Sequence, residues 1–487
     1  MRLSKSKVMS ALQCTKRLHF EVHDRDLAEV SASTQAAFEA GRLVGETTRE
    51  IYGTRAGTLI EYTPGLEEAL GETAELMARG PSGPIFEATL EHAGVLVRLD
   101  VLLPAGSAWR IVEVKSTTSL KGEHLADCAI QAWVFEGAGY TFERLALAHV
   151  DNTFVYQGGG DFGGLLVEQD VTEEVRELMA EVPGWVELAR QAAASTRPAV
   201  AVGEHCSKPY PCPFFKQCWP SAAEYPVYGL GGRKAALAEL VKKGYGDIRD
   251  VPAGRLKSDQ HRRIHRVTSG GEAELLDGAA VFARNLAYPR YYLDFETVAP
   301  AVPIWAGTRP YERLPVQWSC HIEAEPRQMR HEEFLDLEGE PPMRALAESL
   351  IEKLGTEGPV LIYTGYEKGV INDLATRFPD LAPRLSALVE RVVDLHPIAK
   401  TNYYHPDMLG SWSIKAVLPT VAAEMRYSVL EEIREGTTAS QAYFEAIQPD
   451  TTQERREELR ERLFEYCKYD TEAMVRLVRF FGADTAK

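Results

Sequence analysis

The spacing of apolar residues predicts a chain built from strands and helices. Residues 38–52 repeat their apolar positions at helical spacing, and the stretch 124–137 does the same further along. Between them lie short apolar runs at 85–90, 94–103 and 109–115, the pattern of buried strands. Strands mixed with helices in this way indicate an α/β layer fold.

The same pattern divides the chain into regions. A helix around 171–195 and a turn-rich cysteine run close a first domain, which we place at residues 1–222. Residues 223–288 carry two helical patterns and predict a helical connector. Its spacing L-x-x-x-G-Y-x-x-I-x-x-V-P loosely resembles a helix–hairpin–helix, a module that grips phosphates. A solvated linker is the alternative.

The last region, residues 289–487, begins with a short apolar strand. RYYLDFET predicts this strand at 290–297, and further strands are expected at 316–323 and 359–363, with helices filling the rest. A chain of 487 residues is expected to form two or three domains, because single cores stop growing near roughly 250–300 residues.

Composition and charge limit the function classes. Apolar residues make up 45% of the sequence, and no stretch reaches the roughly 20 apolar residues that span a bilayer. The basic N-terminal segment lacks the apolar run of a secretory signal, so we expect a cytoplasmic protein without membrane partners. The net charge of −17 argues against a nonspecific nucleic-acid coat protein. It does not exclude a nuclease, which clusters carboxylates at its metals and keeps basic side chains along one groove.

Three charged residues of the first domain lie within apolar strand patterns. Asp100 belongs to one predicted strand, and Glu113-x-Lys115 ends the next. A hairpin of these strands brings Asp100 beside Glu113, and side chains two apart on a strand face the same side. Two such carboxylates hold Mg²⁺ or Mn²⁺, while the lysine orients water or steadies charge on a phosphate. A salt bridge between Lys115 and a neighbouring acid is the structural alternative.

A second group of acids lies in the last region. Asp294-Phe295-Glu296 ends an apolar strand, so both carboxylates face one side, as a two-metal site requires. Far downstream, Tyr466 and Asp470 are four residues apart on a predicted helix and share one of its faces. Asp470 is expected to close the metal site and Tyr466 to position the attacking water. A surface charge or a helix cap explains any one of these acids alone, whereas their order along the chain favours a metal site.

The seven cysteines are unevenly placed. Cys206, Cys212 and Cys218 form a C-x5-C-x5-C run, and Cys14 lies far upstream. Disulfides are not expected in a cytoplasmic chain of this length.

The first domain resembles the PD-(D/E)xK nucleases of the RecB type, in which a glutamine follows the ExK strand. The resemblance implies a restriction-endonuclease-like fold and catalytic roles for four residues: Asp100, Glu113, Lys115 and Gln131. Relatives also carry a histidine or an acid on a helix near the N-terminus. Here Gly45 stands where many relatives have histidine, and Glu46 is the substitute as an outer ligand.

A subset of these nucleases binds a 4Fe–4S cluster through one cysteine before the nuclease core and three after it. This subset includes the CRISPR spacer-acquisition nucleases and one subunit of bacterial end-resection complexes. The order of cysteines here is similar, so the resemblance implies four cluster ligands: Cys14, Cys206, Cys212 and Cys218. The two x5 gaps differ from the tighter C-x2-C of many relatives, and tetrahedral zinc is the alternative.

The last domain resembles the DnaQ-like 3′–5′ exonucleases of the DEDD class, tyrosine subtype, which have a ribonuclease H-like fold. Their middle acid commonly follows a strand in a pattern like Asn-x2-Phe-Asp. Here Glu367 takes the place of that aspartate, Tyr363 stands where the asparagine is usual, and Asp373 is the runner-up. The resemblance implies the metal ligands Asp294, Glu296, Glu367 and Asp470.

Over nearly its whole length the chain resembles an uncharacterised bacterial and archaeal family that fuses these two kinds of domain. The phrases LDFETVAPAVPIWAGTRPYERLPVQWSCHI, HPDMLGSWSIKAVLP and YCKYDTEAM carry this resemblance. We therefore predict a metal-dependent exonuclease that acts on DNA ends or single strands in repair or defence. One alternative is a ribonuclease that trims RNA, since no feature of the sequence decides for or against a 2′-hydroxyl. Another is a DNA-end binding protein in which one nuclease site is vestigial.

Overall fold

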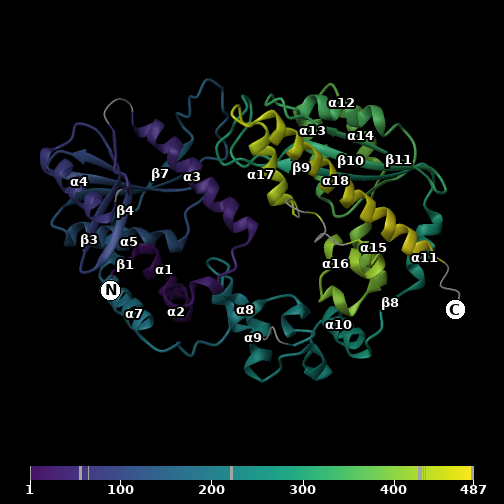
Figure 1. Ribbon diagram of the computed structural model, residues 1–487, viewed down its shortest axis with the longest axis horizontal. Coiled ribbons are helices and arrows are strands. Elements are labelled where there is room, and N and C mark those ends of the chain that lie inside the picture. The colour runs from purple at the N-terminus through teal and green to yellow at the C-terminus, as the bar shows by residue number, and fades with distance from the viewer. Residues whose placement is uncertain are drawn as a thin grey trace. The chain divides into compact units, whose positions relative to one another are not determined.

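The chain is a mixed α/β protein that divides into two compact units (Figure 1). The computed structural model describes residues 2–53, 57–63, 65–219, 223–425, 430, 433 and 435–483. Unit 1 comprises Met1–Trp219 and Pro300–Glu312, and unit 2 comprises Pro220–Ala299 and Arg313–Lys487. The predicted connector therefore belongs to unit 2, and a segment of the predicted last domain belongs to unit 1.

The described strands of unit 1 form one seven-stranded sheet. They are β1 (Leu3–Ser4), β2 (Thr58–Leu59), β3 (Ile85–His92), β4 (Val95–Ala105), β5 (Ala108–Lys115), β6 (Phe142–Val150) and β7 (Leu166–Asp170). The order is β2-β3-β4-β5-β6-β7, with β1 beside β4. β3, β4 and β5 are antiparallel neighbours, as the predicted hairpin requires, whereas β5 and β6 run parallel and are joined by a helix.

Helices cover both faces of this sheet. The helices of unit 1 are α1 (Lys5–Gln13), α2 (Thr15–His23), α3 (Ala32–Tyr52), α4 (Leu66–Arg79), α5 (Gly122–Gly137), α6 (Thr172–Met179), α7 (Val182–Ala194) and α8 (Phe215–Cys218). The apolar side of α5 is buried with the inner residues of β4 and β5, together with α1 and α7. On the opposite face, Val44 of α3 packs with Val150 and with Ala301 of the Pro300–Glu312 segment.

The second unit is built around a five-stranded sheet. Its strands are β9 (Arg290–Val298), β10 (Leu314–Glu325), β11 (Gln328–Leu335), β12 (Val360–Ile362) and β13 (Val392–Asp394). The order is β11-β10-β9-β12-β13, in which β10 is antiparallel to both neighbours and β9, β12 and β13 run parallel. A separate pair joins β8 (Glu274–Leu275) to β14 (Tyr403–Tyr404).

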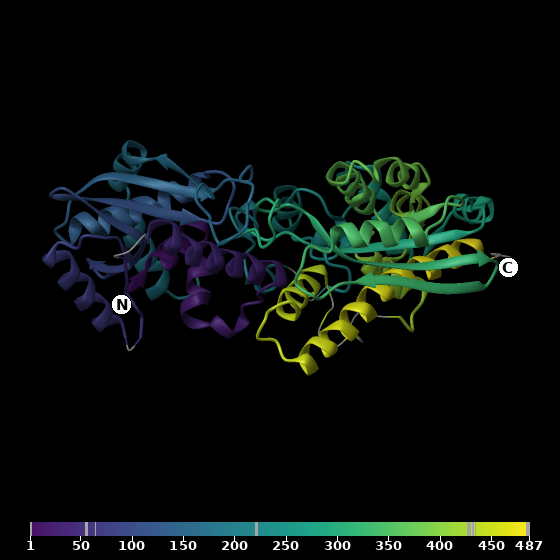
Figure 2. The same ribbon diagram turned by 90° about the horizontal axis from the view of Figure 1, so that it is seen from above.

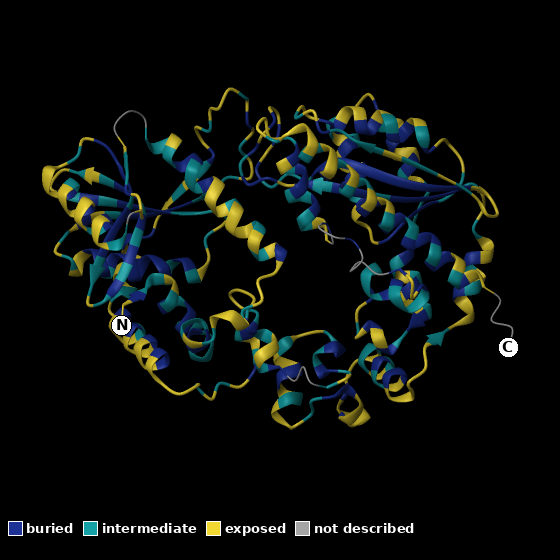
Figure 3. Cartoon of the chain, viewed as in Figure 1, coloured by how far each residue is buried: buried dark blue, intermediate teal, exposed yellow. Residues whose placement is uncertain are grey.

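The helices of unit 2 sandwich its sheet. They are α9 (Lys234–Lys242), α10 (Asp259–Gly270), α11 (Asp277–Asn285), α12 (Met343–Lys353), α13 (Tyr366–Arg377), α14 (Ala382–Glu390), α15 (Leu395–Asn402), α16 (Ile414–Val421), α17 (Gly436–Ala446) and α18 (Gln453–Gly482). Figure 2 shows α18 along one face and α12 to α14 on the other. Buried residues gather in β9 and β10, which are covered on both sides (Figure 3).

Most strongly periodic segments form the predicted elements, and two predictions were wrong. The helix expected at 171–195 is broken into α6 and α7, with Pro183 in the first turn of the second helix. The region after 323 was expected to hold only the strand at 359–363 among helices, yet β11 and β13 are strands. β11 is polar because it lies at a sheet edge, so it lacks the apolar run of a central strand.

Two further observations concern the predicted connector and the length of the apolar helices. In the predicted connector, α9 and α10 are separated by short 3₁₀ turns at Ile248–Asp250 and Ala253–Arg255. No helix in the described part of the chain is long and apolar enough to cross a membrane.

Candidate functional site

The acids of the second unit reach one cavity from three separate segments. Asp294 and Glu296 alternate with apolar residues along β9, so both point to the face covered by α18. The neighbouring Gln317 of β10 confirms this direction, because its Nε2 donates to the carbonyl of Leu463 on α18 at 2.9 Å. Tyr466 and Asp470 are four residues apart on α18 and are both buried toward the sheet.

These side chains line a cavity of about 580 Å³. Its lining includes the five residues predicted to act at this site: Asp294, Glu296, Glu367, Tyr466 and Asp470. Burial and, after it, the nearby Asp470 carboxylate raise the pKa of Glu296 to about 8. Burial likewise raises the pKa of Glu367 to about 8 and that of Asp294 well above its usual range. The cavity therefore concentrates carboxyl groups that resist losing their protons.

Of the two candidates for the middle acid, Glu367 lines this cavity and Asp373 does not. Glu367 lies in the first turn of α13 and is 5% exposed, and it hydrogen-bonds Asp294. Asp373 instead pairs with Arg313 at 2.5 Å, with half of its side chain exposed. Glu367 follows a turn after β12. In this turn Thr364 has a φ of 97°, which is unfavourable for a β-branched residue, and its N–H donates to Asp394 Oδ1 at 3.0 Å.

A lysine that the sequence analysis missed joins the site. Lys415 is the second residue of α16 (Ile414–Val421) and lines the cavity, and its Nζ donates to the Tyr466 hydroxyl at 3.2 Å. Its charge also opposes the rise in the pKa of Glu296. The phrase SWSIKAVLP gave no signal of this role, because only the fold brings α16 to α18.

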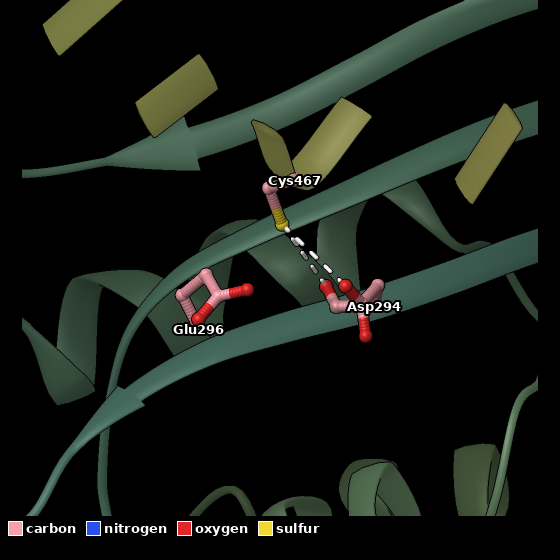
Figure 4. Close-up of side chains that lie close together, drawn as sticks. All are labelled: Asp294, Glu296 and Cys467. Atoms are coloured by element: carbon pink, nitrogen blue, oxygen red, sulfur yellow. Dashed lines mark hydrogen bonds between the residues drawn. The ribbon is translucent and has the colours of Figure 1, made fainter. Parts of the chain in front are cut away.

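Cys467 lies directly beside the acids. Figure 4 shows its Sγ, on α18, pointing toward Asp294 on β9, with 4.0 Å to both the carbonyl oxygen and Oδ2. Ligand atoms of Asp294, Glu296 and Cys467 lie within 4.8 Å of one another, the spacing of a metal-binding group. No role was predicted for Cys467 from the sequence, although it lies between Tyr466 and Asp470 on the predicted helix.

The carboxylates of the first unit meet where β4 and β5 lie side by side. The Val114 N–H donates to Asp100 Oδ2 at 2.7 Å, and Gln131 Nε2 donates to Glu113 Oε2 at 2.7 Å. Lys115 Nζ donates to Glu113 Oε1 at 2.5 Å. The structure thus brings together the four residues predicted for this site: Asp100, Glu113, Lys115 and Gln131.

Two more charged residues complete this group. Lys5, the first residue of α1, donates to Glu113 Oε1 at 3.0 Å and contacts Asp127 at 3.1 Å. Lys115 also contacts Asp127, at 2.5 Å. Burial opposes ionisation of Glu113, but the two lysines outweigh it and hold the pKa of Glu113 well below its usual range. Asp127 could have been predicted from the sequence, since it lies one helical turn before Gln131. No pattern in the sequence pointed to Lys5.

A cavity of about 330 Å³ opens beside Asp100 and Lys115, under α3. Gly45 lines it, and a Cβ added there would meet nothing within 4 Å. Glu46, the expected outer ligand, lines the same cavity but pairs with Arg42 at 2.5 Å. Glu87 of β3 is a further acid in the lining, with an unusual backbone φ of 57°. Its charge adds to those that raise the pKa of Asp100, after burial and Glu113.

The four cysteines predicted to act together line one small cavity. They are Cys14, Cys206, Cys212 and Cys218. Cys14 is the cap residue between α1 and α2, whereas the other three lie in the turn-rich run around α8. Burial raises the pKa values of the Cys212 and Cys218 thiols. Cys128 and Cys320 lie instead in the cores of units 1 and 2.

Comparison with known proteins finds that one stretch of the chain is similar to a described family. Residues 291–413 match the family described as "Domain of unknown function (DUF2779)", a stretch that includes Asp294, Glu296 and Glu367. None of the curated proteins compared with the chain matches it. A solved structure titled "Crystal structure of SSO0001" is 14% identical to the chain, covering 43% of it and 84% of its own length, with a TM-score of 0.22.

Proposed function

We propose that the protein is a metal-dependent nuclease with two nuclease centres, most active on DNA with a free end or single strand. The observation that carries the proposal is the convergence of four acids, from β9, α13 and α18, on one buried cavity: Asp294, Glu296, Glu367 and Asp470. Mutually repelling carboxylates at such a site are costly unless cations compensate them.

The donor set fits divalent metal ions. Mg²⁺ and Mn²⁺ prefer carboxylate oxygens, and the buried Oε2 of Glu367 has no hydrogen-bond partner among the described residues. Asp294, Glu296, Glu367 and Asp470 would hold the ions. Two such ions would supply an activated water and would neutralise the leaving oxygen of a phosphodiester.

The side chains around the acids suit this chemistry. The Tyr466 hydroxyl would orient the attacking water, and Lys415, which donates to that hydroxyl, would fix its direction and attract the phosphate. The sheet order, with β10 antiparallel to its neighbours, supports a DnaQ-like exonuclease of the ribonuclease H-like class. Such an enzyme would trim a strand from its 3′ end.

For the first unit we propose a RecB-like PD-(D/E)xK nuclease. Asp100 and Glu113 would bind Mg²⁺ or Mn²⁺, Gln131 holds Glu113 in place, and Lys115 would act on the reacting phosphate. The four cysteines, which line one cavity, would hold a 4Fe–4S cluster, with zinc as the alternative. Binding either would displace protons from thiols whose pKa values are raised.

One observation favours a second candidate for unit 1, a DNA-end binding module with a vestigial centre. Lys5 and Lys115 already neutralise Glu113 and Asp127, and Gly45 offers no ligand. A Cβ added at residue 45 would meet nothing within 4 Å, and the residue lines the cavity, so Gly45→His offers a ligand at this position. We expect Gly45→His to tighten Mn²⁺ binding to unit 1 by about tenfold, measured by isothermal titration with Gly45→Ala as the control for helix propensity. Unchanged affinity would favour the vestigial centre.

A parallel digestion tests the proposed function. End-labelled single-stranded DNA, duplex DNA and RNA are incubated with Mg²⁺ or Mn²⁺ and with wild type, Lys115→Ala or Asp294→Ala. Trimming from the 3′ end should survive Lys115→Ala and disappear with Asp294→Ala, and the remaining cleavage should disappear when both changes are combined. A ribonuclease would degrade RNA and spare DNA. Cleavage that withstands both changes together would refute both centres.

A further inference from the structure

The start of helix α1 is built into the first carboxylate site. Leu3 and Ser4 pair with β4, and Ser4 caps α1 by accepting from the Lys7 N–H. The next residue, Lys5, is thereby held with its Nζ 3.0 Å from Glu113 and 3.1 Å from Asp127. Its side chain is 21% exposed. Lys5 is therefore fixed by the strand and cap behind it and by two carboxylates in front of it.

The other end of α1 is clamped to the cysteine run. Gln13, the last helical residue, donates from its Nε2 to the carbonyls of His205 and Tyr210, both at 2.7 Å. Cys14 follows as the C-cap, and its N–H donates to Ser10 at 2.9 Å. One short helix thus carries a cysteine of the proposed cluster at one end and the lysine of the carboxylate group at the other.

We infer that α1 couples the cysteine site to the first carboxylate site, with Lys5 as the positioning residue that transmits the coupling. The inference rests on the proposed function, in which the cysteines hold a cluster or zinc and Asp100 and Glu113 bind Mn²⁺. A nine-residue helix is a stiff element of about 13 Å, so a displacement of its Cys14 end moves Lys5.

The effect of this movement follows from charge. Lys5 repels a divalent cation approaching Glu113, because both compete for Oε1. Loss of the cluster or zinc loosens the last turn of α1 and withdraws Lys5. Mn²⁺ then binds more tightly to Asp100 and Glu113. Lys115, left alone between Glu113 and Asp127, is held away from the substrate, so cleavage by unit 1 falls.

The test measures Mn²⁺ affinity and does not depend on activity. Full-length protein carrying Asp294→Asn and Asp470→Asn, which disable the second site, is prepared with the cysteine site loaded anaerobically with iron and sulfide, or with Zn²⁺, and also stripped. Free Mn²⁺ is followed by electron paramagnetic resonance. Stripping should lower the Kd for Mn²⁺ by at least about fivefold, the lower end of typical coupling between sites. In Lys5→Met the same stripping should change the Kd by less than about twofold.

Two further variants test whether the coupling depends on Lys5 and on the Gln13 contacts. Lys7→Met removes a lysine from the same helix and should keep the full coupling. Gln13→Ala cuts the clamp while leaving all thiols, and in the loaded protein it should give the low Kd of the stripped protein. Equal Kd values for loaded and stripped protein would overturn the inference alone, as would coupling that persists in Lys5→Met. No Mn²⁺ binding in any species, or no loading of iron or zinc, would overturn the proposed function of unit 1 and the inference with it.

Discussion

At the scale of single residues, the second unit concentrates buried carboxyl groups around few positive charges. Lys415 is the basic side chain among the described residues that line the cavity, beside the four acids. Burial and mutual repulsion therefore raise the pKa values of Glu296 and Glu367 to about 8. Such groups exchange a proton for a metal ion, so we expect metal affinity to increase as pH rises through this range.

The same shifts predict how stability depends on pH. A carboxyl group whose pKa is higher in the folded protein than in the unfolded chain binds more protons when folded, so the free energy of unfolding decreases as pH rises. With EDTA present, we expect unit 2 to lose roughly 3–5 kcal/mol between pH 5 and pH 8. Urea unfolding followed by hydrogen exchange of unit 2 peptides measures this loss, and Mg²⁺ should restore stability at pH 8. Glu367→Gln should flatten the dependence; an unchanged slope would contradict the assignment.

Tyr466 offers a second prediction at this scale. Tyr466→Phe keeps the ring and removes the hydroxyl that accepts from Lys415, without removing a metal ligand. We expect kcat for 3′ trimming to fall by about 10²-fold, the size of a lost positioning group, with metal affinity unchanged. Asp470→Ala should abolish trimming and weaken Mn²⁺ binding, because ligands of one site act as a unit. Equal losses of metal affinity in both variants would contradict the separate roles.

At the scale of elements, local periodicity predicted most of the strands and helices that hold the candidate site residues. The strands around Asp100, Glu113 and Asp294 and the helix around Gln131 follow from runs of apolar residues and from helical spacing. The hairpin of β4 and β5 and the shared face of Tyr466 and Asp470 follow from the same geometry. The candidate ligand positions could be predicted because acids interrupt otherwise apolar strands.

The elements that were missed depend on distant partners. β11 is a polar edge strand that forms because it pairs with β10. No pattern within its own residues predicts a strand. Lys5 and Lys415 come from helices that the fold brings to the acids from far along the chain. Spacing rules act over a few turns or strands, so they do not reach such contacts.

Glu87 illustrates a strained element and carries a prediction. Its φ of 57° lies within β3, opposite the position of Asp100 on β4, where a left-handed backbone costs roughly 1–2 kcal/mol. Glu87→Gly should therefore be about 1 kcal/mol more stable than Glu87→Ala, since both lose the carboxylate and only glycine relieves the strain. Both variants should bind Mn²⁺ in unit 1 more weakly than wild type. Equal stability of the two variants in urea unfolding would show that the strain is absent in solution.

At the scale of the whole molecule, remote stretches of sequence complete each unit. Pro300–Glu312 leaves the path between β9 and β10 and packs in unit 1, where the Tyr311 hydroxyl donates to the Ser116 carbonyl. Cys14 meets a cysteine run that begins at Cys206. Sequence spacing alone did not predict the first of these connections, and only the family resemblance suggested the second.

In the proposed function, a cluster or zinc held by the four cysteines would join the start of unit 1 to the cysteine run near residue 206. A cross-link between Cys14 and the Cys206 run would close a loop of nearly two hundred residues, and closing a loop of that size stabilises by roughly 5 kcal/mol in chain-entropy terms. Anaerobically purified protein should carry about four irons per chain and absorb broadly near ~400 nm. Cys14→Ala should bleach this absorbance and speed hydrogen exchange throughout unit 1. Cys320 is a buried thiol of unit 2, so Cys320→Ala should neither bleach the absorbance nor speed hydrogen exchange in unit 1. Stoichiometric zinc without iron would show that the cysteines bind zinc in place of the cluster. Unchanged protection of unit 1 from hydrogen exchange in Cys14→Ala would show that the thiols do not cross-link it.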